Sequence, residues 1–384
     1  MKEYLLGVLT LISLNLFSQI ITGAEQTNQY FHLLKNKNIG LVVNQTSTIN
    51  KTHLVDTLLS SKFSIKMVFA PEHGFRGTAD AGEHIKNQTD KKTGLPIISL
   101  YGNNKKPSKM QLEGIDVLIF DIQDVGVRFY TYISTMHYIM EACAEQGIFV
   151  IILDRPNPNG HYVAGPVLKP KYKSFVGMYP IPLVHGLTIG ELANMANTEK
   201  WLEEGITCNL KVIPCQNYTH ETRYKLPIKP SPNLPNTISI MLYPSLCLFE
   251  PTEVSIGRGT SFPFQVAGTP NGRQTGSFSF IPKSIIGMSK HPKYENEECF
   301  GIDFRTQKTR NFTIEPLIEF YKSSTDPEGF FTNSSFFNLL VGNGKLIEQI
   351  RKGVTYEKIK LSWEPELKEY LLLRSKYLLY PDFN

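Results

Sequence analysis

The stretch FAPEHGFRGTADAGEHI, residues 69–85, gathers side chains that can exchange protons or bind a metal. These are Glu72, His73, Arg76, Asp80, Glu83 and His84. A carboxyl group that is partly shielded from water has a raised pKa, which a general acid needs near neutral pH. Glu72 fits this description because it follows the apolar run MVFA. The alternative is that Glu72 only caps the following turn.

A metal site is the second chemistry that this stretch suggests. His73 and His84 can supply ligands together with Asp80 or Glu83. The chain has neither an HExxH motif nor a CxxC pair, and a histidine beside a carboxylate more often orients it or binds substrate. We therefore predict no metal. We expect Glu83 to be either a second carboxylate of the site or a solvated loop charge.

A second stretch, FDIQDVGVRFYTYIS (120–134), combines acids, an amide, a cation and a phenol. The residues are Asp121, Gln123, Asp124, Arg128 and Tyr130. Such a set can grip a polyhydroxylated ligand through many hydrogen bonds. The competing interpretation is a buried pair between Asp124 and Arg128 that fixes the loop.

Two shorter motifs add candidate ligand-binding residues. In DRPNPNG (154–160), two prolines and Asn-Gly give a stiff, turned backbone, and Asp154 and Arg155 either face a cleft or belong to a structural turn. In GRGT (257–260), Arg258 can pair with a substrate carboxylate through two parallel hydrogen bonds. This motif lacks the spacing of a phosphate-binding P-loop, so we predict no nucleotide site.

The elements that position these residues are predicted by apolar periodicity. Residues 38–45, 65–72, 96–102, 116–124 and 148–156 are nearly continuous apolar runs, typical of parallel strands covered on both faces. Residues 53–61 and 131–147 have helical spacing, and Gly147 predicts a helix end. This alternation predicts an α/β fold with a βαβ sheet.

Polar residues end four of these strands. They are Asn44–Gln45, Glu72–His73, residues 121–124 and Asp154–Arg155. Sites in open parallel sheets form beyond the carboxyl ends of the strands. We therefore expect these side chains to share one cleft, with Asn44 among the ligand-binding residues.

The rest of the chain is less regular. Residues 186–202 predict a helix with Thr188 as N-cap and Glu191 completing a capping box. Residues 226–260 read as a Pro-rich crossing loop, an apolar run and a Gly-rich turn, and residues 362–381 as an amphipathic helix. We place a domain boundary at 248, which separates a catalytic domain (25–248) from a C-terminal auxiliary domain (249–384) that completes the cleft.

Composition excludes several classes of protein. The 384 residues carry a net charge of +5 with scattered Lys and Arg, so we expect no nucleic-acid partner. Five thinly spread cysteines do not make a disulfide scaffold. No GxSxG elbow or GxGxxG loop follows a strand, which argues against a serine hydrolase and a nicotinamide enzyme, and we predict no cofactor.

The N-terminus predicts export. Residues 1–18 hold one Lys and a short apolar run, which fits a signal peptide cleaved between residues 18 and 24. The alternative is a buried first helix. After cleavage we expect a periplasmic or secreted protein without a membrane span.

With these segments in view, the chain resembles the NamZ-type exo-β-N-acetylmuramidases, which are peptidoglycan hexosaminidases. The resemblance lies in NQTS (44–47), FAPEHGFRGTADAGEHI, DIQDVGVRFYTYISTM, DRPNPNG, GMYPIPLVHGLTIGELA, SPNLP and SIGRGT. These blocks stand in order from about Gly23 to the C-terminal KYLLYP.

The resemblance implies a Rossmann-like domain, a smaller C-terminal domain and an active site between them. It also implies release of terminal N-acetylmuramic acid from peptidoglycan fragments, with Glu72 as the catalytic glutamate. Glycoside hydrolysis normally needs a second group, for which Glu83, Asp121 and Asp124 are candidates.

Muramic acid differs from other hexosamines in its lactyl carboxylate, and an arginine can pair with such a group. The candidates are Arg76, Arg128, Arg155 and Arg258, while Tyr130 or Tyr132 can stack on the sugar ring. Two other functions stay open: a periplasmic muropeptide-binding protein without turnover, and a metal-dependent peptidoglycan amidase that uses His73 and His84.

Overall fold

A seven-stranded sheet forms the centre of the N-terminal half of the protein. The computed structural model describes residues 19–71, 75, 88–306 and 311–383. The strands are β1 (Asn38–Val43), β4 (Ser64–Ala70), β5 (Gln88–Thr89), β6 (Pro96–Ser99), β7 (Val117–Asp121), β8 (Phe149–Leu153) and β9 (Leu210–Ile213). Their order is β5-β6-β4-β1-β7-β8-β9, and every neighbouring pair is parallel except β5 with β6.

The order of the parallel strands identifies a doubly wound sheet. Numbered along the chain, β6-β4-β1-β7-β8-β9 read 3-2-1-4-5-6, which is the Rossmann order. The direction of winding reverses between β1 and β7, so this is the switch point of the sheet. The five predicted strands and the predicted α/β fold are confirmed.

Helices cover the sheet as the apolar pattern predicted. They are α1 (Leu54–Ser60), α2 (Tyr132–Gln146) and α3 (Ile189–Thr198). Along β1, Val42 faces one buried cluster while Leu41 and Val43 face another, so both sides of the sheet are packed. Helix α2 ends at Gly147 with φ 66°, and α3 begins with the predicted capping box.

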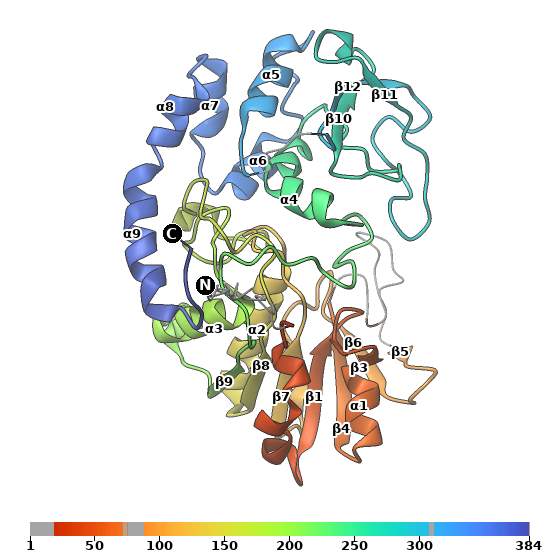
Figure 1. The fold of residues 1–384 in the computed structure, drawn as a ribbon, viewed down its shortest axis with the longest axis vertical. Helices are drawn as coiled ribbons and strands as arrows, with labels where there is room; N and C mark the ends of the chain where they lie inside the picture. Colours follow the sequence, from red (N-terminus) through yellow and green to blue (C-terminus); the bar gives the residue numbers. More distant parts are fainter. Residues whose placement is uncertain (1–18, 72–74, 76–87, 307–310, 384) are drawn as a thin grey trace, which may run out of the picture.

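The C-terminal part is a smaller α+β unit, drawn above the sheet in Figure 1. A three-stranded antiparallel sheet has the order β10-β12-β11. The elements are α4 (Thr237–Leu246), β10 (Val266–Thr269), β11 (Phe278–Phe280), β12 (Cys299–Asp303), α5 (Glu315–Ser323), α6 (Ser334–Val341), α7 (Leu346–Arg351), α8 (Tyr356–Leu361) and α9 (Glu364–Arg374). A two-residue hairpin, β2 (Thr48–Ile49) with β3 (Thr52–His53), follows β1.

The C-terminal tail returns to the first sheet, and Figure 1 shows the end of the chain, marked C, beside α9. Arg374 on α9 donates to the carbonyl of Gly186 at 3.0 and 2.7 Å. The backbone N–H of Leu379 donates to Glu191 Oε1 at 2.8 Å. The two parts of the chain are therefore tied together at the tail as well as at the crossing segments.

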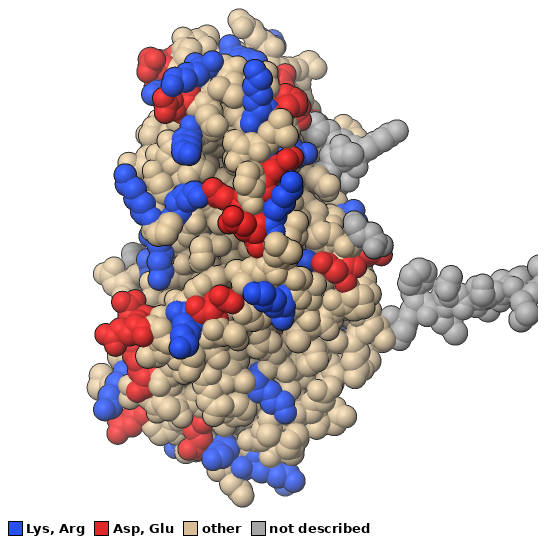
Figure 2. Space-filling model, turned by 90° about the vertical axis from the view of Figure 1, so that its left-hand side faces the viewer, with Lys and Arg blue, Asp and Glu red and all other residues tan. Residues whose placement is uncertain are grey.

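The face of the molecule in Figure 2 carries both signs of charge, and the cysteines are unpaired. On the face in Figure 2, Lys and Arg side chains alternate with Asp and Glu without one sign dominating. All five cysteines are free and buried, so no disulfide is formed. Among the residues that the structure describes, none of the helices has both the length and the apolar character needed to span a bilayer.

Candidate active site at the carboxyl edge of the sheet

The polar ends of β1, β7 and β8 are interlocked. The backbone N–H of Gln123 donates to Thr46 Oγ1 at 3.0 Å, and the Ser47 hydroxyl donates to the carbonyl of Asp121. Three of the four predicted polar strand ends follow the neighbouring strands β1, β7 and β8, so they lie along one edge of the sheet. The fourth, Glu72–His73, lies outside the described residues, and the shared cleft stays a prediction.

Asp121 and Arg155, both predicted to bind substrate, form an internal ion pair instead. Arg155 Nε lies 2.6 Å from Asp121 Oδ1, and its terminal nitrogen lies 2.9 Å from Oδ2. Arg155 also donates to the carbonyl of Thr48 at 3.2 Å. Both side chains are at least 95% buried. A bidentate pair so far from water fixes the loops after β1, β7 and β8, and leaves neither residue for a ligand.

Asp154 and Gln123 also serve the fold. Asp154 accepts hydrogen bonds from Gly190 N at 2.8 Å and Thr188 Oγ1 at 2.7 Å, both at the start of α3. It accepts a third from the Tyr380 hydroxyl at 2.5 Å, in the C-terminal tail. The Gln123 amide donates to two loop carbonyls at 2.8 Å. Their predicted roles as substrate ligands are replaced by roles in joining loop, helix and tail.

Replacing Asp154 by Asn should change how stability depends on pH. Burial raises the pKa of Asp154 from 3.8 to about 6. Between pH 4 and 6 the folded chain therefore holds a proton that the unfolded chain has released, so stability falls as the pH rises. Across this pH range the unfolding free energy falls by at most about 3 kcal/mol because of this proton. The unfolding free energy of Asp154→Asn, measured in urea at several pH values, should not show this pH dependence. An equal pH dependence in the wild type and the variant would contradict the raised pKa of Asp154.

Arg128 is buried among carbonyl groups. Its guanidinium donates to the carbonyls of Pro166 and Ile181 at 2.7 Å, and to those of Leu340 and Val341 at 3.0 and 2.7 Å. Burial lowers its pKa, but an arginine starts so high that it stays protonated at neutral pH. With an exposure of 0% it cannot meet a substrate carboxylate, and it does not pair with Asp124 either. Both sequence interpretations of Arg128 were wrong.

Asn44 and Asp124 each keep a polar atom without a hydrogen-bond partner in the described part of the chain. These atoms are Asn44 Nδ2 and Asp124 Oδ1. Asn44 is oriented by Thr46, whose N–H and hydroxyl both donate to Asn44 Oδ1 at 2.9 and 2.6 Å. One donor and one acceptor are thus held at the switch point, ready for a polar ligand.

The loop around Asp124 explains how that carboxylate is oriented. Asp124 Oδ2 accepts from Gly126 N at 2.7 Å, and His185 Nε2 lies 3.8 Å from the same oxygen. Gly126 has φ +77°, and a Cβ there would lie 2.2 Å from Asn157 Oδ1. Only glycine fits this turn without strain. The turn therefore directs Asp124 Oδ2 toward internal bonds, while Oδ1 has no partner among the residues that the structure describes.

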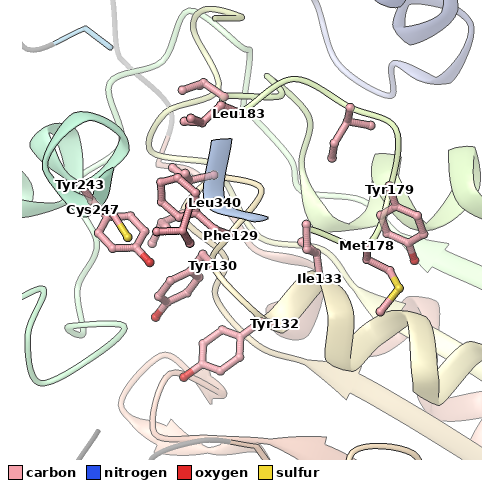
Figure 3. Close-up of a cluster of buried hydrophobic side chains, with 14 of the residues drawn as sticks. Phe129, Tyr130, Tyr132, Ile133, Met178, Tyr179, Leu183, Tyr243, Cys247 and Leu340 are labelled. Atoms are coloured by element: carbon pink, nitrogen blue, oxygen red, sulfur yellow. The ribbon is translucent and has the colours of Figure 1, made fainter. Parts of the chain in front are cut away.

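An aromatic pocket adjoins this edge and contains two of the predicted ligand residues. Its aromatic walls, labelled in part in Figure 3, are Phe129, Tyr130, Tyr132, Tyr243 and Phe264. Its polar members include Ser231, Asn233 and Arg258. The Tyr130 hydroxyl donates to the carbonyl of Pro230 at 3.0 Å, and Gln45 donates to the same carbonyl at 3.1 Å. The pocket is therefore bonded to the loop that follows β1.

Several pocket residues were not among the sequence candidates. Tyr243 lies on α4, in an apolar run that gave no sign of lining a site, and its ring centroid is 5.8 Å from that of Tyr130. Ser231 and Asn233 belong to the block SPNLP. Polar residues between prolines in a crossing loop were the signal that could have identified them.

The stretch that opened the sequence analysis lies mostly outside the described residues. Glu72, His73, Arg76, Glu83 and His84 are all in the ranges 72–74 and 76–87. Phe75, between these ranges, is buried and meets the His53 ring edge-on at 4.8 Å. His53 Nε2 is in turn hydrogen-bonded to the carbonyl of Asn44 at 2.9 Å. Phe75 thus lies close to the end of β1.

The described residues contain no group of three or more His, Cys, Asp or Glu side chains that could hold a metal. His73 and His84 lie outside the described residues, so a metal site that contains them stays a hypothesis.

Comparisons with known proteins agree on one family. Residues 39–238 match the family model of the N-terminal part of the exo-β-N-acetylmuramidase NamZ, and residues 241–380 match its C-terminal part. The two models meet ahead of residue 248. The Bacillus subtilis (strain 168) peptidoglycan β-N-acetylmuramidase NamZ is 39% identical over 376 residues, which cover 91% of this chain and 89% of the relative.

Two crystal structures of DUF1343 family proteins from Bacteroides fragilis NCTC 9343 have the same fold. One superposes with a TM-score of 0.87 at 48% identity and covers 95% of this chain and 100% of its own. The other has a TM-score of 0.81 at 29% identity and covers 94% and 99%. The chain therefore belongs to the NamZ exo-β-N-acetylmuramidase family, as its sequence blocks predicted.

Proposed function

We propose that this protein is an exo-acting glycoside hydrolase that releases terminal β-linked N-acetylmuramic acid from the non-reducing ends of peptidoglycan fragments. The observation that carries the proposal is the match of both family models, together with 39% identity to a peptidoglycan β-N-acetylmuramidase over 91% of the chain. The position of the open polar atoms supports it, because they lie at the switch point where such sheets bind ligands.

Glu72 is the proposed proton donor. In glycoside hydrolysis a carboxylic acid protonates the leaving oxygen, and a second carboxylate or an equivalent group acts at the anomeric carbon. Glu72 follows the last residue of β4, Ala70, by two positions, and β4 is hydrogen-bonded to β1. The strand end that leads into Glu72 therefore lies beside β1.

Asp124 is the proposed second group, with Glu83 as the other candidate. Among the described aspartates that end β7 and β8, Asp121 and Asp154 are engaged by internal partners. Asp124 keeps one oxygen without a partner in the described chain. Ionised, it can stabilise positive charge at the anomeric carbon or accept a proton from attacking water.

The substrate sugar is proposed to lie between this edge and the aromatic pocket. Asn44 Nδ2 can donate to a sugar oxygen, and the rings of Tyr130 and Tyr132 offer apolar faces. Such faces pack on the C–H side of a sugar ring, while the polar atoms around them fix its orientation. His73 and Arg76 remain predicted ligands of the same sugar.

A chromogenic assay separates this function from its competitors. Purified protein should release 4-nitrophenol from 4-nitrophenyl β-N-acetylmuraminide in many turnovers, and chelators should not affect the rate. Binding of muropeptide without any release would favour a non-catalytic binding protein. Release of stem peptide from muropeptide in place of 4-nitrophenol, lost with a chelator and restored by zinc, would favour the amidase that uses His73 and His84.

Export is proposed from the N-terminal sequence. Residues 1–18 fit a signal peptide, which would deliver the enzyme to the periplasm or beyond, where wall fragments occur. Expressed in a Gram-negative host, the chain should appear in the periplasmic fraction with a new N-terminus between residues 19 and 25. A cytoplasmic protein that still begins at residue 1 would contradict export.

A further inference from the structure

The four arginines that sequence analysis offered to the substrate carboxylate are not equivalent in the structure. Arg128 is enclosed by four carbonyls, and Arg155 is matched bidentately by Asp121. Arg76 lies outside the described residues. Arg258 is different, because it lines the aromatic pocket and 29% of its side chain is exposed. It is the candidate from the described chain that a ligand can reach.

The internal partner of Arg258 uses only part of its hydrogen-bonding capacity. Its Nε and one terminal nitrogen both lie 2.7 Å from a single oxygen, Oε1 of Glu250. A guanidinium carries five N–H donors and matches a carboxylate best when each oxygen takes one donor. Glu250 is itself 26% exposed, so it can turn toward water. The pair is therefore less saturated than Arg155 with Asp121.

The ring of Phe264 holds the guanidinium in the pocket. Arg258 Cζ lies 4.9 Å from the Phe264 ring centroid, and the Phe264 ring packs edge-on against Tyr243 at 5.0 Å. An arginine stacked on an aromatic face keeps a fixed plane while its edge stays free for hydrogen bonds. The cation is thus pre-oriented, with little ordering left for a ligand to impose.

The size of the pocket suits part of a sugar. Its volume is about 100 Å³, whereas sites that enclose a whole small molecule measure roughly 300 Å³ or more. A short side group with one methyl and one carboxylate matches this space. Aromatic walls such as Tyr130 and Tyr243 can cover the methyl, and Arg258 can meet the carboxylate.

We propose that Arg258 recognises the lactyl carboxylate of N-acetylmuramic acid, and that Glu250 accepts hydrogen bonds from the Arg258 guanidinium until that carboxylate replaces it. The inference rests on the proposed function, since that function supplies the lactyl-bearing sugar. It makes Arg258 a specificity-determining residue that distinguishes this sugar from N-acetylglucosamine, which has a hydroxyl in place of the lactyl ether.

Calorimetric binding of the two free sugars tests the inference without requiring turnover. Wild-type protein should bind N-acetylmuramic acid at least tenfold more tightly than N-acetylglucosamine. Arg258→Gln should weaken binding of N-acetylmuramic acid by about 10- to 100-fold, the usual effect of losing a hydrogen-bonded charge, and should leave N-acetylglucosamine unchanged. Arg258→Lys should bind N-acetylmuramic acid with an affinity between those of the wild type and Arg258→Gln, because lysine keeps the charge but not the two parallel N–H donors.

Arg273→Gln is the matched control, since Arg273 also stacks on a phenylalanine, Phe300 at 3.8 Å, but does not line the pocket. It should bind both sugars like the wild type. The inference is overturned if Arg258→Gln binds N-acetylmuramic acid normally, if it weakens both sugars equally, or if the wild type does not distinguish them. Selective binding without any glycoside cleavage would instead overturn the proposed function and leave the role of Arg258 standing.

Discussion

The Glu72→Gln variant is expected to cleave a disaccharide with N-acetylmuramic acid at its non-reducing end about 10³-fold more slowly than the wild type. Glutamine has the shape of the acid but no proton to give to the departing sugar oxygen. Loss of a general acid typically lowers kcat by 10²- to 10⁴-fold. Initial rates of sugar release, measured at saturating disaccharide, give this ratio directly.

A second leaving group distinguishes a proton donor from a residue that merely binds the sugar. 4-Nitrophenolate departs readily without protonation, so Glu72→Gln should lose much less activity on the 4-nitrophenyl glycoside than on the disaccharide. Glu113→Gln removes an exposed carboxylate that precedes the amino end of β7, whereas the candidate site lies at the carboxyl ends of the strands. This variant should leave both rates unchanged. Equal losses on the two substrates, or wild-type activity of Glu72→Gln on the disaccharide, would remove Glu72 as the acid.

The Arg128→Met variant is expected to lose about 3–5 kcal/mol of unfolding free energy. Methionine fills part of the volume but removes the arginine donors of three buried carbonyls, those of Pro166, Leu340 and Val341, whereas Ile181 keeps the N–H of Leu168 as a donor. Each unsatisfied group costs about 1–3 kcal/mol before the structure relaxes. Leu340 and Val341 are the last residues of α6, whose negative dipole end the guanidinium also neutralises. Urea unfolding of purified variants measures the loss.

Arg128 joins the two parts of the protein, so the same experiment tests that role. Pro166 and Ile181 belong to the N-terminal half, whereas Leu340 and Val341 belong to the C-terminal half. Arg128→Lys keeps the charge and some donors and should lose less than Arg128→Met. The surface variant Arg273→Met should stay within about 0.5 kcal/mol of the wild type. If Arg128→Met unfolded like that surface control, Arg128 would not join the two parts.

Local patterns were sufficient to predict five strands of the seven-stranded sheet and the helices α1, α2 and α3 that cover it. A run such as DVLIFD is apolar at successive positions, and a strand with both faces buried requires that. Gly147 and the pair Thr188 and Glu191 act within one helical turn, so their effect could be predicted from neighbouring residues alone. The carboxyl edge followed from the same argument, because parallel strands end on one side.

The partners of the polar residues at that edge could not be predicted, since they come from distant segments. Asp121 pairs with Arg155, which lies 34 residues further along the chain, and Arg128 donates to the carbonyl of Val341, which lies 213 residues further along. A sequence pattern shows that a charged residue ends a strand, but not whether a distant group engages it. Five predicted ligands are engaged by internal partners that the sequence pattern does not show: Asp121, Gln123, Arg128, Asp154 and Arg155. Asn44 and Asp124 each keep one polar atom without a partner among the described residues.

Helix α4 shows a second limit of local patterns. The predicted apolar run within residues 226–260 was not assigned to a helix, and it contains Pro244, a residue that normally disrupts a helix interior. In the structure the carbonyl of Ile240, which Pro244 cannot bond, accepts a hydrogen bond from Asn159 Nδ2 at 3.2 Å. A side chain from DRPNPNG thus replaces the missing helical bond, and Tyr243 is carried into the pocket.

The central claim is that this chain removes muramic acid from the non-reducing end of its substrate. Two isomeric disaccharides test it most directly, N-acetylmuramyl-β-1,4-N-acetylglucosamine and N-acetylglucosaminyl-β-1,4-N-acetylmuramic acid, with released sugars identified by mass spectrometry. We predict free N-acetylmuramic acid from the first isomer and no cleavage of the second. Cleavage of the second isomer, or no release from the first, would contradict the account.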